Sequence, residues 1–527
     1  MAGPHNAARD RLFQPEANNR LAAYTRIGPD KPAALGQTMP DQLFRLPADS
    51  HTSLQNRIRE MLVGAILDGH LPAGSAVPSG RKLARQLAVA RNTVVLAYQQ
   101  LVDEGYLVSR ERSGYYVNKD ILNGHAQRHA IRPLADAVSA PNWSNRLQMQ
   151  PSAQRNIVKP RDWQRFPYPF VYGQIDPTLF PIADWRECCR EAVSVRAIRD
   201  WSQDRADSDD PLLVEQIRTR VLPRRGVWAG SDEILITLGA QHALYILAEL
   251  LLNRHSMVGI ENPGYVDARN ILSINSATVK ALAIDDNGLI VGPELDPCDC
   301  LYVTPSHQSP TTVTMPLARR EALLARANKA DFVIIEDDYE SETNYVDDPT
   351  PALKSMDGNG RVVYIGSLSK TLAPGLRMGY MVASRALIHE ARALRRLMLR
   401  HPPSNNQHIV AHFLKRGHHD SLVRRLSHAY RDRWQVMGEN LTRHLPNASR
   451  IPTFGGTSFW VTGPDDLDTR QLQSDALSHG IVLEPGDLFF MGDTPPRHFF
   501  RLGFSSIAVN RIAPGIARLA ELIAATA

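Results

Sequence analysis

Between residues 233 and 367, five short runs rich in β-branched residues alternate with stretches of helical periodicity. The runs are EILIT, MVGIE, CLYVT, DFVIIED and RVVYIGS, and two of the stretches between them are QHALYILAELL and ARREALLARAN. Strands that alternate with helices are typical of a mostly parallel sheet covered by helices on both faces. We therefore expect an α/β domain over residues 166–527. Its last part, with long helices and the strands TSFWVTG and HFFRLGFS, is expected to form a smaller α+β subdomain.

A different pattern occupies residues 51–118. Helical spacing predicts helices over about 54–68, 79–86 and 91–104, and the β-rich runs YLVSR and GYYVN follow as a hairpin. Three helices and a hairpin form a winged helix-turn-helix, which places one helix in the major groove of DNA. Residues 1–50 are expected to be a flexible N-terminal extension. Residues 119–165, with scattered prolines and no clear pattern, are expected to be a linker.

The charge of the whole chain is only +5, so any nucleic-acid contact must be local to this head. The first turn of the third helix offers side chains suited to guanine, adenine and phosphate contacts. The second helix begins with a hydroxyl and basic residues that suit phosphates, and an arginine and a glycine lie on the hairpin. A small helical domain with a solvated basic face is the alternative. The candidate DNA-binding residues are Ser79, Arg81, Arg91, Asn92, Thr93, Arg112 and Gly114.

The segment RVVYIGSLSKTLAPGLRMGY places Lys370 just after a predicted strand. A lysine can form a Schiff base with an aldehyde cofactor, and Ser367, Ser369 and Arg377 can hold a phosphate beside it. Asp337 ends the preceding strand, at the sheet edge where ligands of open α/β sheets bind. An anionic aspartate there can pair with a pyridinium nitrogen.

These motifs carry a family resemblance. The head, with PS-x-R-x-LA, RNTV, AY-x-x-L and EGYL, resembles the winged-helix domain of GntR-type transcription factors. The large domain, with YGQIDPTLFP, TLGAQHAL, ENPGY, EDDYESE, SLSKTLAPGLRMGY and FRLGFS, resembles fold-type I aminotransferases. Together, over about residues 51–527, the chain is similar to the MocR-type (GabR-like) branch of GntR regulators. The resemblance implies a bound pyridoxal 5'-phosphate.

The resemblance also implies roles for single residues. Lys370 would form the Schiff base, Tyr339 would contact the ring oxygen, and Tyr265 would stack on the ring. Arg501 would bind the acidic group of an amine or amino-acid effector. Arg269 is a second candidate for that role, with a plain ion pair as the alternative. The implied cofactor-binding residues are Lys370, Asp337, Tyr339, Tyr265, Ala240, Gln241, Ser367, Ser369, Arg377 and Ser309.

Departures from the family patterns bear on function. Where catalytic aminotransferases usually read N-P-x-G, this chain has Ser309-Pro310-Thr311-Thr312. We therefore expect cofactor binding without efficient turnover: a transcriptional regulator that senses its effector as an external aldimine. A working aminotransferase with an appended DNA-binding head is one alternative, and a DNA-binding protein with a merely dimerising large domain is another. In the head, Ala88 replaces the usual Gly, and Ala90 stands where Ser usually caps the recognition helix.

The resemblance implies a head-to-tail, domain-swapped homodimer that reads an operator with repeated half-sites. Effectors in the family include GABA, taurine and ectoine-derived amino acids, and the sequence does not choose among them. Four cysteines without metal-ligand spacing predict reduced thiols and no metal site. An N-terminus without an apolar region predicts a cytoplasmic protein without a membrane partner.

Overall fold

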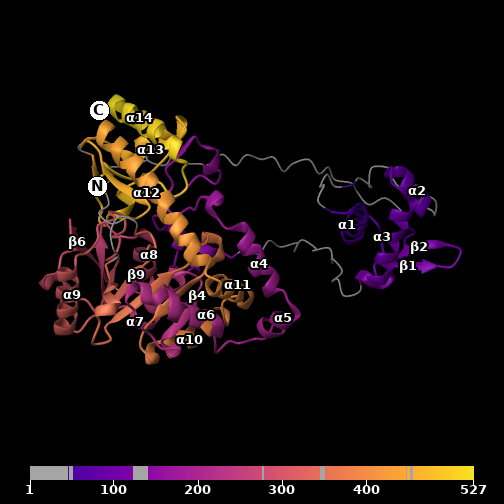
Figure 1. Ribbon diagram of the computed structural model, residues 1–527, viewed down its shortest axis with the longest axis horizontal. Helices are drawn as coiled ribbons and strands as arrows, with labels where there is room; N and C mark the ends of the chain where they lie inside the picture. Colours follow the sequence, from indigo (N-terminus) through magenta and orange to yellow (C-terminus); the bar gives the residue numbers. More distant parts are fainter. Residues whose placement is uncertain are drawn as a thin grey trace, which may run out of the picture. The chain divides into compact units, whose positions relative to one another are not determined.

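The computed structural model of the protein describes residues 46, 52–122, 141–275, 278–344, 350–446, 448–450 and 455–526. The chain separates into two compact units, one ending at Asn142 and the other beginning at Trp143. Figure 1 colours the smaller unit indigo and runs through magenta and orange to yellow along the larger one. The predicted extension over 1–50, apart from Leu46, and residues 123–140 of the predicted linker lie outside the described residues.

The smaller unit has the predicted order of three helices and an antiparallel hairpin, which confirms the winged helix-turn-helix. Apolar side chains from every element form one core, including Ile58, Leu83, Tyr98 and Val117. The Tyr98 hydroxyl donates to the Pro78 carbonyl at 2.7 Å and ties the third helix to the loop before the second. The elements are α1 (Leu54–Leu67), α2 (Gly80–Gln86), α3 (Arg91–Asp103), β1 (Leu107–Arg110) and β2 (Gly114–Val117).

The helix starts in this unit differ in their caps. The hydroxyls of Ser53 and Ser79 accept hydrogen bonds from backbone N–H groups in the first turns of α1 and α2. Ala90 precedes α3 in an extended conformation and makes no side-chain cap. Ala88 has a φ of +52°, which explains why a glycine is usual there. Both alanines therefore leave the turn into α3 less stable than the family residues would.

The larger unit contains the predicted α/β sheet. Its eight strands lie in the order β4-β11-β10-β9-β8-β5-β6-β7. The five strands from β10 to β6 pair in parallel, whereas β11 is antiparallel to both its neighbours and β7 is antiparallel to β6. The strands are β4 (Ile234–Thr237), β5 (Met257–Asn262), β6 (Thr278–Asp285), β7 (Gly288–Leu289), β8 (Cys300–Val303), β9 (Val333–Asp338), β10 (Val362–Ser367) and β11 (Gly379–Val382).

Both faces of this sheet are buried, because alternate side chains of one strand enter different apolar cores. In β10, Val363 and Ile365 pack in the core that contains α7, α8 and α10, whereas Tyr364 packs in the core that contains α6, α11 and α12. Helix α9 covers a third core over β8 and β9. The helices are α6 (Pro211–Gln216), α7 (Ala240–Leu251), α8 (Val266–Asn275), α9 (Leu317–Ala330), α10 (Arg385–Leu399), α11 (Ser404–Lys415) and α12 (His418–His444).

The C-terminal part forms the expected α+β subdomain. A four-stranded antiparallel sheet has the order β12-β13-β16-β15, and Figure 1 shows α13 and α14 beside α12 in this part. A short parallel pair, β3 with β14, ties the start of the unit to its end. The elements are β3 (Tyr168–Pro169), β12 (Ser449–Arg450), β13 (Ser458–Thr462), α13 (Thr469–Ser478), β14 (Ile481–Val482), β15 (Glu484–Pro485), β16 (Phe499–Gly503) and α14 (Val509–Thr526).

Residues 143–165, the last part of the predicted linker, fall within the larger unit. Gln154 Nε2 donates to the Asn270 carbonyl at 3.1 Å, and Lys159 Nζ lies 3.2 Å from Glu484 Oε1. The boundary between the units thus lies at 142–143, before the predicted 165. Two further helices, α4 (Ile182–Ala192) and α5 (Val195–Trp201), follow in the larger unit. In the described part of the chain, every helix is too short or too polar to cross a membrane.

Candidate functional site

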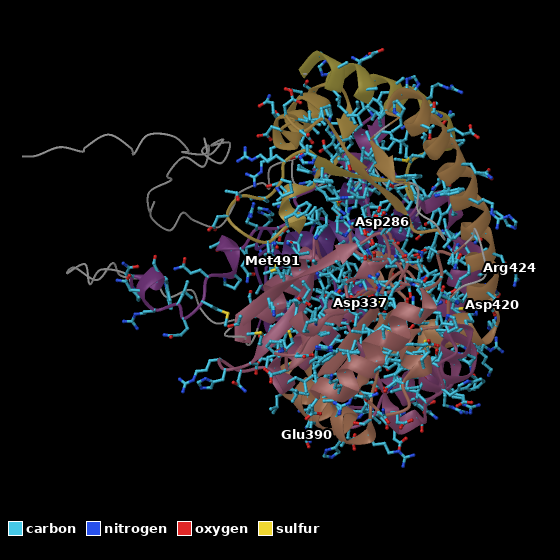
Figure 2. All side chains as sticks on the ribbon, turned by 90° about the vertical axis from the view of Figure 1, so that its left-hand side faces the viewer. Asp286, Asp337, Glu390, Asp420, Arg424 and Met491 are labelled. Carbon is cyan, nitrogen blue, oxygen red and sulfur yellow. The ribbon has the colours of Figure 1, made fainter. Side chains whose placement is uncertain are left out.

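A cavity of about 160 Å³ lies at the carboxyl ends of the central parallel strands, where sheets of this type bind ligands. Asp337 comes from β9, Lys370 follows β10, and α7 begins at the rim after β4. Figure 2 shows Asp337 deep in the larger unit, whereas Glu390 and Arg424 lie toward its outside. The lining residues are Tyr172, Gly173, Gly239, Ala240, Gln241, Tyr265, Ser309, Asp337, Tyr339, Ser367, Ser369, Lys370, Pro374 and Arg377.

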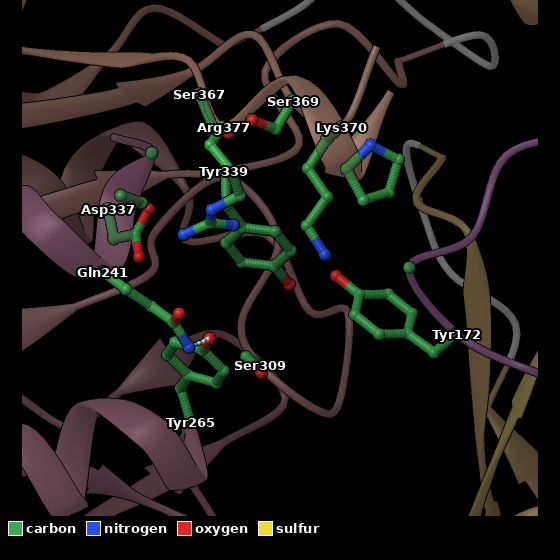
Figure 3. A pocket seen from close by; sticks show the side chains of 14 residues that line it. Tyr172, Gln241, Tyr265, Ser309, Asp337, Tyr339, Ser367, Ser369, Lys370 and Arg377 are labelled. Carbon is green, nitrogen blue, oxygen red and sulfur yellow. Dashed lines mark hydrogen bonds between the residues drawn. The ribbon is translucent and has the colours of Figure 1, made fainter. Parts of the chain in front are cut away.

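Lys370 points its amine into this cavity. Its Nζ lies 4.5 Å from the centre of the Tyr172 ring and 5.9 Å from that of Tyr339, and Figure 3 shows the three side chains directed toward one another. Burial lowers the pKa of Lys370 to about 8, because an ammonium loses hydration in the cavity. A lysine tuned in this way has a substantial neutral fraction near neutral pH, as nucleophilic attack on an aldehyde requires.

Asp337 presents an oxygen without a protein partner. Its Oδ2 accepts a hydrogen bond from the Tyr302 hydroxyl at 2.8 Å, whereas its buried Oδ1 has no partner among the described residues. Burial raises the pKa of Asp337 to about 7. A protonated ring nitrogen would satisfy Oδ1 and hold the carboxylate in its ionised form, so the residue fits a pyridinium partner.

The start of α7 forms a cradle suited to phosphate. Gly239 precedes the helix with a φ of +84°, and a Cβ there would lie only 3.2 Å from Nη2 of Arg377. The first N–H groups of α7, at Ala240 and Gln241, have no partner within the helix and can bind an anion. Arg377 Nη2 donates to the Leu238 carbonyl at 2.9 Å, which holds the guanidinium at this helix end.

Four more predicted cofactor residues are engaged with protein groups, and one of them, Tyr339, donates its hydroxyl to the His307 carbonyl at 2.8 Å. The Ser369 hydroxyl donates to the Met378 carbonyl at 3.1 Å and accepts from the Met378 N–H at 3.0 Å, so its proton is committed to the loop backbone. Gln241 Nε2 donates to the Tyr265 hydroxyl at 3.1 Å (Figure 3) and to Asp267 Oδ2 at 2.5 Å. These bonds fix the Tyr265 ring at the wall of the cavity.

In the loop of residues 304–312, the backbone conformation of the last residue shows why a glycine is usual there. Thr312 is buried and has a φ of +62°, a conformation that glycine adopts at much lower cost. Its hydroxyl donates to the Thr311 carbonyl at 2.6 Å. Ser309 lines the cavity, and its N–H donates to Thr304 Oγ1 at 3.0 Å. The loop thus keeps its path despite both substitutions.

The two candidate effector arginines lie outside the cavity wall. Arg501 is 3% exposed and binds Glu484 Oε2 through Nε at 2.8 Å and through Nη2 at 2.6 Å. Its guanidinium lies 3.9 Å from the centre of the Tyr172 ring, and this ring lines the cavity. Arg269 instead donates to the Phe490 carbonyl at 3.1 Å and does not line the cavity.

In the head, the predicted DNA-binding side chains gather on α2, α3 and the hairpin. Arg81 and Arg91 lie at one surface hollow between α2 and α3, and both are exposed, as is Asn92. Thr93 is half-buried. Arg112 and Gly114 form the tip of the hairpin, where both have positive φ.

Several residues of the site were not predicted from the sequence. Tyr172, Gly173 and Pro374 line the cavity, and Tyr302 binds Asp337. Tyr172 belongs to the YGQIDP motif, which contributed to the family resemblance, but no role was predicted for any of its residues. The partner of Arg501, Glu484, comes from the neighbouring strand, and no spacing in the sequence pointed to it.

Comparison with known proteins places both units. Residues 54–117 match the family "Bacterial regulatory proteins, gntR family", and residues 207–518 match "Aminotransferase class I and II". The chain is 41% identical over 485 residues to the HTH-type transcriptional regulator TauR of Rhodobacter capsulatus, which covers 92% of this chain and 99% of the relative. The probable rhizopine catabolism regulatory protein MocR of Rhizobium meliloti is 29% identical over 475 residues, covering 89% and 94%.

Among solved structures, the kynurenine aminotransferase of Pyrococcus horikoshii superposes with a TM-score of 0.66 at 26% identity. The superposition covers 73% of this chain and 98% of that protein. The larger unit thus has the fold-type I architecture of pyridoxal-phosphate enzymes, as predicted.

Proposed function

Since the chain belongs to the MocR-type branch of the GntR family of transcriptional regulators, we propose that it senses a small amine through pyridoxal 5'-phosphate. The proposal rests on one observation: Lys370 and Asp337 line the same cavity, and Oδ1 of Asp337 has no hydrogen-bond partner among the described residues. A bound pyridoxal phosphate would supply an aldehyde that can condense, with loss of water, with the amine of Lys370 or with that of the effector.

The residues of the cavity have separate tasks. Asp337 would hold a bound ring nitrogen in its protonated form, and Tyr265 and Tyr339 would position the ring. The N-terminus of α7 and Arg377 hold the phosphate, which costs little because these donors are already fixed by the protein. The amine of Lys370 would bind the cofactor's aldehyde. When the effector's amine replaces it, Lys370 would remain in the cavity as a free amine or an ammonium.

Binding without turnover is supported by the loop at residues 304–312. Ser309 has a shorter side chain than the asparagine usual in catalytic aminotransferases, so its hydroxyl would reach less far toward the ring oxygen of a bound cofactor. A working aminotransferase is the second candidate, because Lys370 and Asp337 are retained and the 26%-identical structural neighbour is an aminotransferase. Sustained formation of a keto acid from an amino donor would favour this second candidate.

The effector signal reaches DNA through the head. We propose that Arg91, Asn92 and Thr93 read base edges, and that Ser79 and Arg81 bind phosphates, with Arg112 and Gly114 near the flanking backbone. A head-to-tail homodimer, with each head exchanged to its partner, would bring two heads to an operator with repeated half-sites.

The test compares Lys370→Met with Lys329→Met, a control at an exposed lysine of α9. Wild-type protein and the control should gain visible absorbance on addition of pyridoxal phosphate. Amines from a panel should then shift this spectrum and change the affinity for the DNA upstream of the protein's own gene. Lys370→Met should lose the absorbance and the amine response while keeping DNA affinity. A full amine response in Lys370→Met would overturn the proposal.

A further inference from the structure

A six-residue segment before β3, residues 154–159, contacts α8, β15 and an aromatic cluster, and we call it the strap. Asn270, on α8, donates through Nδ2 to the Arg155 carbonyl at 3.0 Å and to Asn156 Oδ1 at 2.9 Å. Ile157 packs against the aromatic cluster around Trp460. In the sequence, the strap lies between the DNA-binding head and β3. A change in the position of the strap could therefore be passed along the chain to the head.

The last residue of the strap is linked through Glu484 to Arg501, which the family resemblance assigns to the effector's acidic group. Lys159 Nζ lies 3.2 Å from Glu484 Oε1 and also donates to the Tyr172 carbonyl. The other carboxylate oxygen of Glu484, Oε2, accepts a hydrogen bond from Arg501 Nε at 2.8 Å and lies 2.6 Å from Arg501 Nη2. One buried carboxylate therefore bridges the strap and Arg501.

A single ring connects this cluster to the cavity. Tyr172 lies with its ring centre 3.9 Å from the Arg501 guanidinium and 4.5 Å from Lys370 Nζ. A contiguous path thus runs from the cavity through Tyr172, Arg501 and Glu484 to Lys159 of the strap.

The charges of the cluster leave little freedom. Burial alone would raise the pKa of Glu484, but the nearby Arg501 and Lys159 hold it below its ordinary value, so the carboxylate is ionised at neutral pH. An effector's acidic group that approaches Arg501 therefore meets a carboxylate already in place. Two carboxylates on one buried guanidinium repel each other, so displacement of Glu484 would favour binding of the effector's acidic group.

The structure provides a space for that movement. Glu484 also lines a second cleft, of about 310 Å³, on the side of the strap. Arg155, Asn156, Ile157 and Val158 form the strap's side of this cleft. A Glu484 side chain released from Arg501 can turn toward this space and keep its contact with Lys159.

We propose that Glu484 is an internal substitute for the effector's acidic group, and that its displacement from Arg501 repositions the strap through Lys159. The inference rests on the proposed function and adds a regulatory contact to the same site. It makes Glu484 and Lys159 positioning residues, which act through Arg501 and the strap rather than on the amine itself.

The test uses stable probes that need no imine chemistry. Reduced pyridoxyl-phosphate adducts of β-alanine and GABA carry an acidic group, and the adducts of propylamine and butylamine are their acid-free matches. Dissociation constants and hydrogen–deuterium exchange of the strap are measured on the full chain for wild type, Glu484→Gln and Lys159→Met. Arg161→Met, at an exposed residue beside the strap, is the matched control.

In wild type and the control, an acid-bearing adduct should change strap exchange and its acid-free match should not. Glu484→Gln should raise the preference for the acid-bearing adduct by roughly tenfold, since a competing charged hydrogen-bond partner is removed. Lys159→Met should raise strap exchange without any adduct and abolish the response. A merely structural role for Glu484 would instead weaken both kinds of adduct together.

The outcomes separate the two proposals. If no adduct binds wild type, the cofactor site and the proposed function fail. If the adducts bind but the strap responds equally to both kinds, or Glu484→Gln leaves the preference unchanged, the internal substitute is overturned and the cofactor site stands. Should Glu484→Gln fail to fold, Lys159→Met decides: a strap that responds as in wild type overturns the inference.

Discussion

The reactivity of Lys370 toward pyridoxal phosphate should depend on pH in a way set by its burial. The pKa of Lys370 lies at about 8 instead of 10.5, because the cavity desolvates the ammonium. At about pH 7.5, roughly a quarter of the amine is then neutral, against about one part in a thousand for an unshifted lysine. Since only the neutral amine attacks the aldehyde, cofactor loading should be roughly two hundred times faster than for an exposed lysine.

The assay is the rate at which cofactor-free protein gains visible absorbance after mixing with pyridoxal phosphate, measured from about pH 6 to 10. The rate should rise with pH and reach half its maximum near pH 8. Glu340 is buried and its negative charge favours the ammonium form of Lys370. Glu340→Gln should therefore move the midpoint to lower pH, whereas Glu390→Gln, at an exposed site, should leave it in place.

A midpoint above about pH 10 would refute the reasoning, because it would mean that Lys370 is hydrated like a surface lysine. A midpoint that moves upward in Glu340→Gln would refute the assigned sign of the electrostatic effect. Circular dichroism across the same pH range checks that the fold is retained.

Two further predictions concern the head. Ala90→Ser should stabilise α3 by about 1 kcal/mol, because the extended backbone at Ala90 allows a serine cap; hydrogen exchange of the first turn of α3 should slow roughly fivefold, and unchanged exchange would contradict it. Arg91→Ala should cost about 1–3 kcal/mol in affinity for the chain's own upstream DNA. Fluorescence anisotropy checks this against scrambled DNA, and equal losses on both would assign Arg91 to phosphate contact instead.

The fold could be predicted well from the sequence, because the periodicity of apolar residues and the order of the predicted elements both indicate it. The alternation of strands and helices indicated the parallel sheet, and the helix–hairpin order indicated the head. The linker was harder. Residues 143–165 have no periodicity, yet the strap within them is held by single polar contacts such as Asn270 with Asn156. Such contacts join positions more than a hundred residues apart, and local patterns do not record them.

The site was predictable where one motif supplies neighbouring groups, as for Lys370 and Arg377. It was not predictable where the partner comes from another strand. Arg501 was expected to bind the effector's acidic group, and the sequence did not show that β15 brings Glu484 opposite it in the sheet. A buried guanidinium without an anion would be costly, so a partner was required on physical grounds, although the sequence alone did not identify it.

The Arg501–Glu484 pair gives the proposed sensor a definite energetic relation between affinity and signal. An effector can move the protein between two arrangements only by binding one of them more tightly. If Glu484 must leave Arg501 before the acidic group binds, the free energy lost in breaking that pair lowers the effector's affinity. Without effector, the same free energy favours the arrangement in which Glu484 links the strap to Arg501. Weakening the pair should therefore tighten binding and, at saturating effector, reduce the response, because the released arrangement is then already more populated in the empty protein.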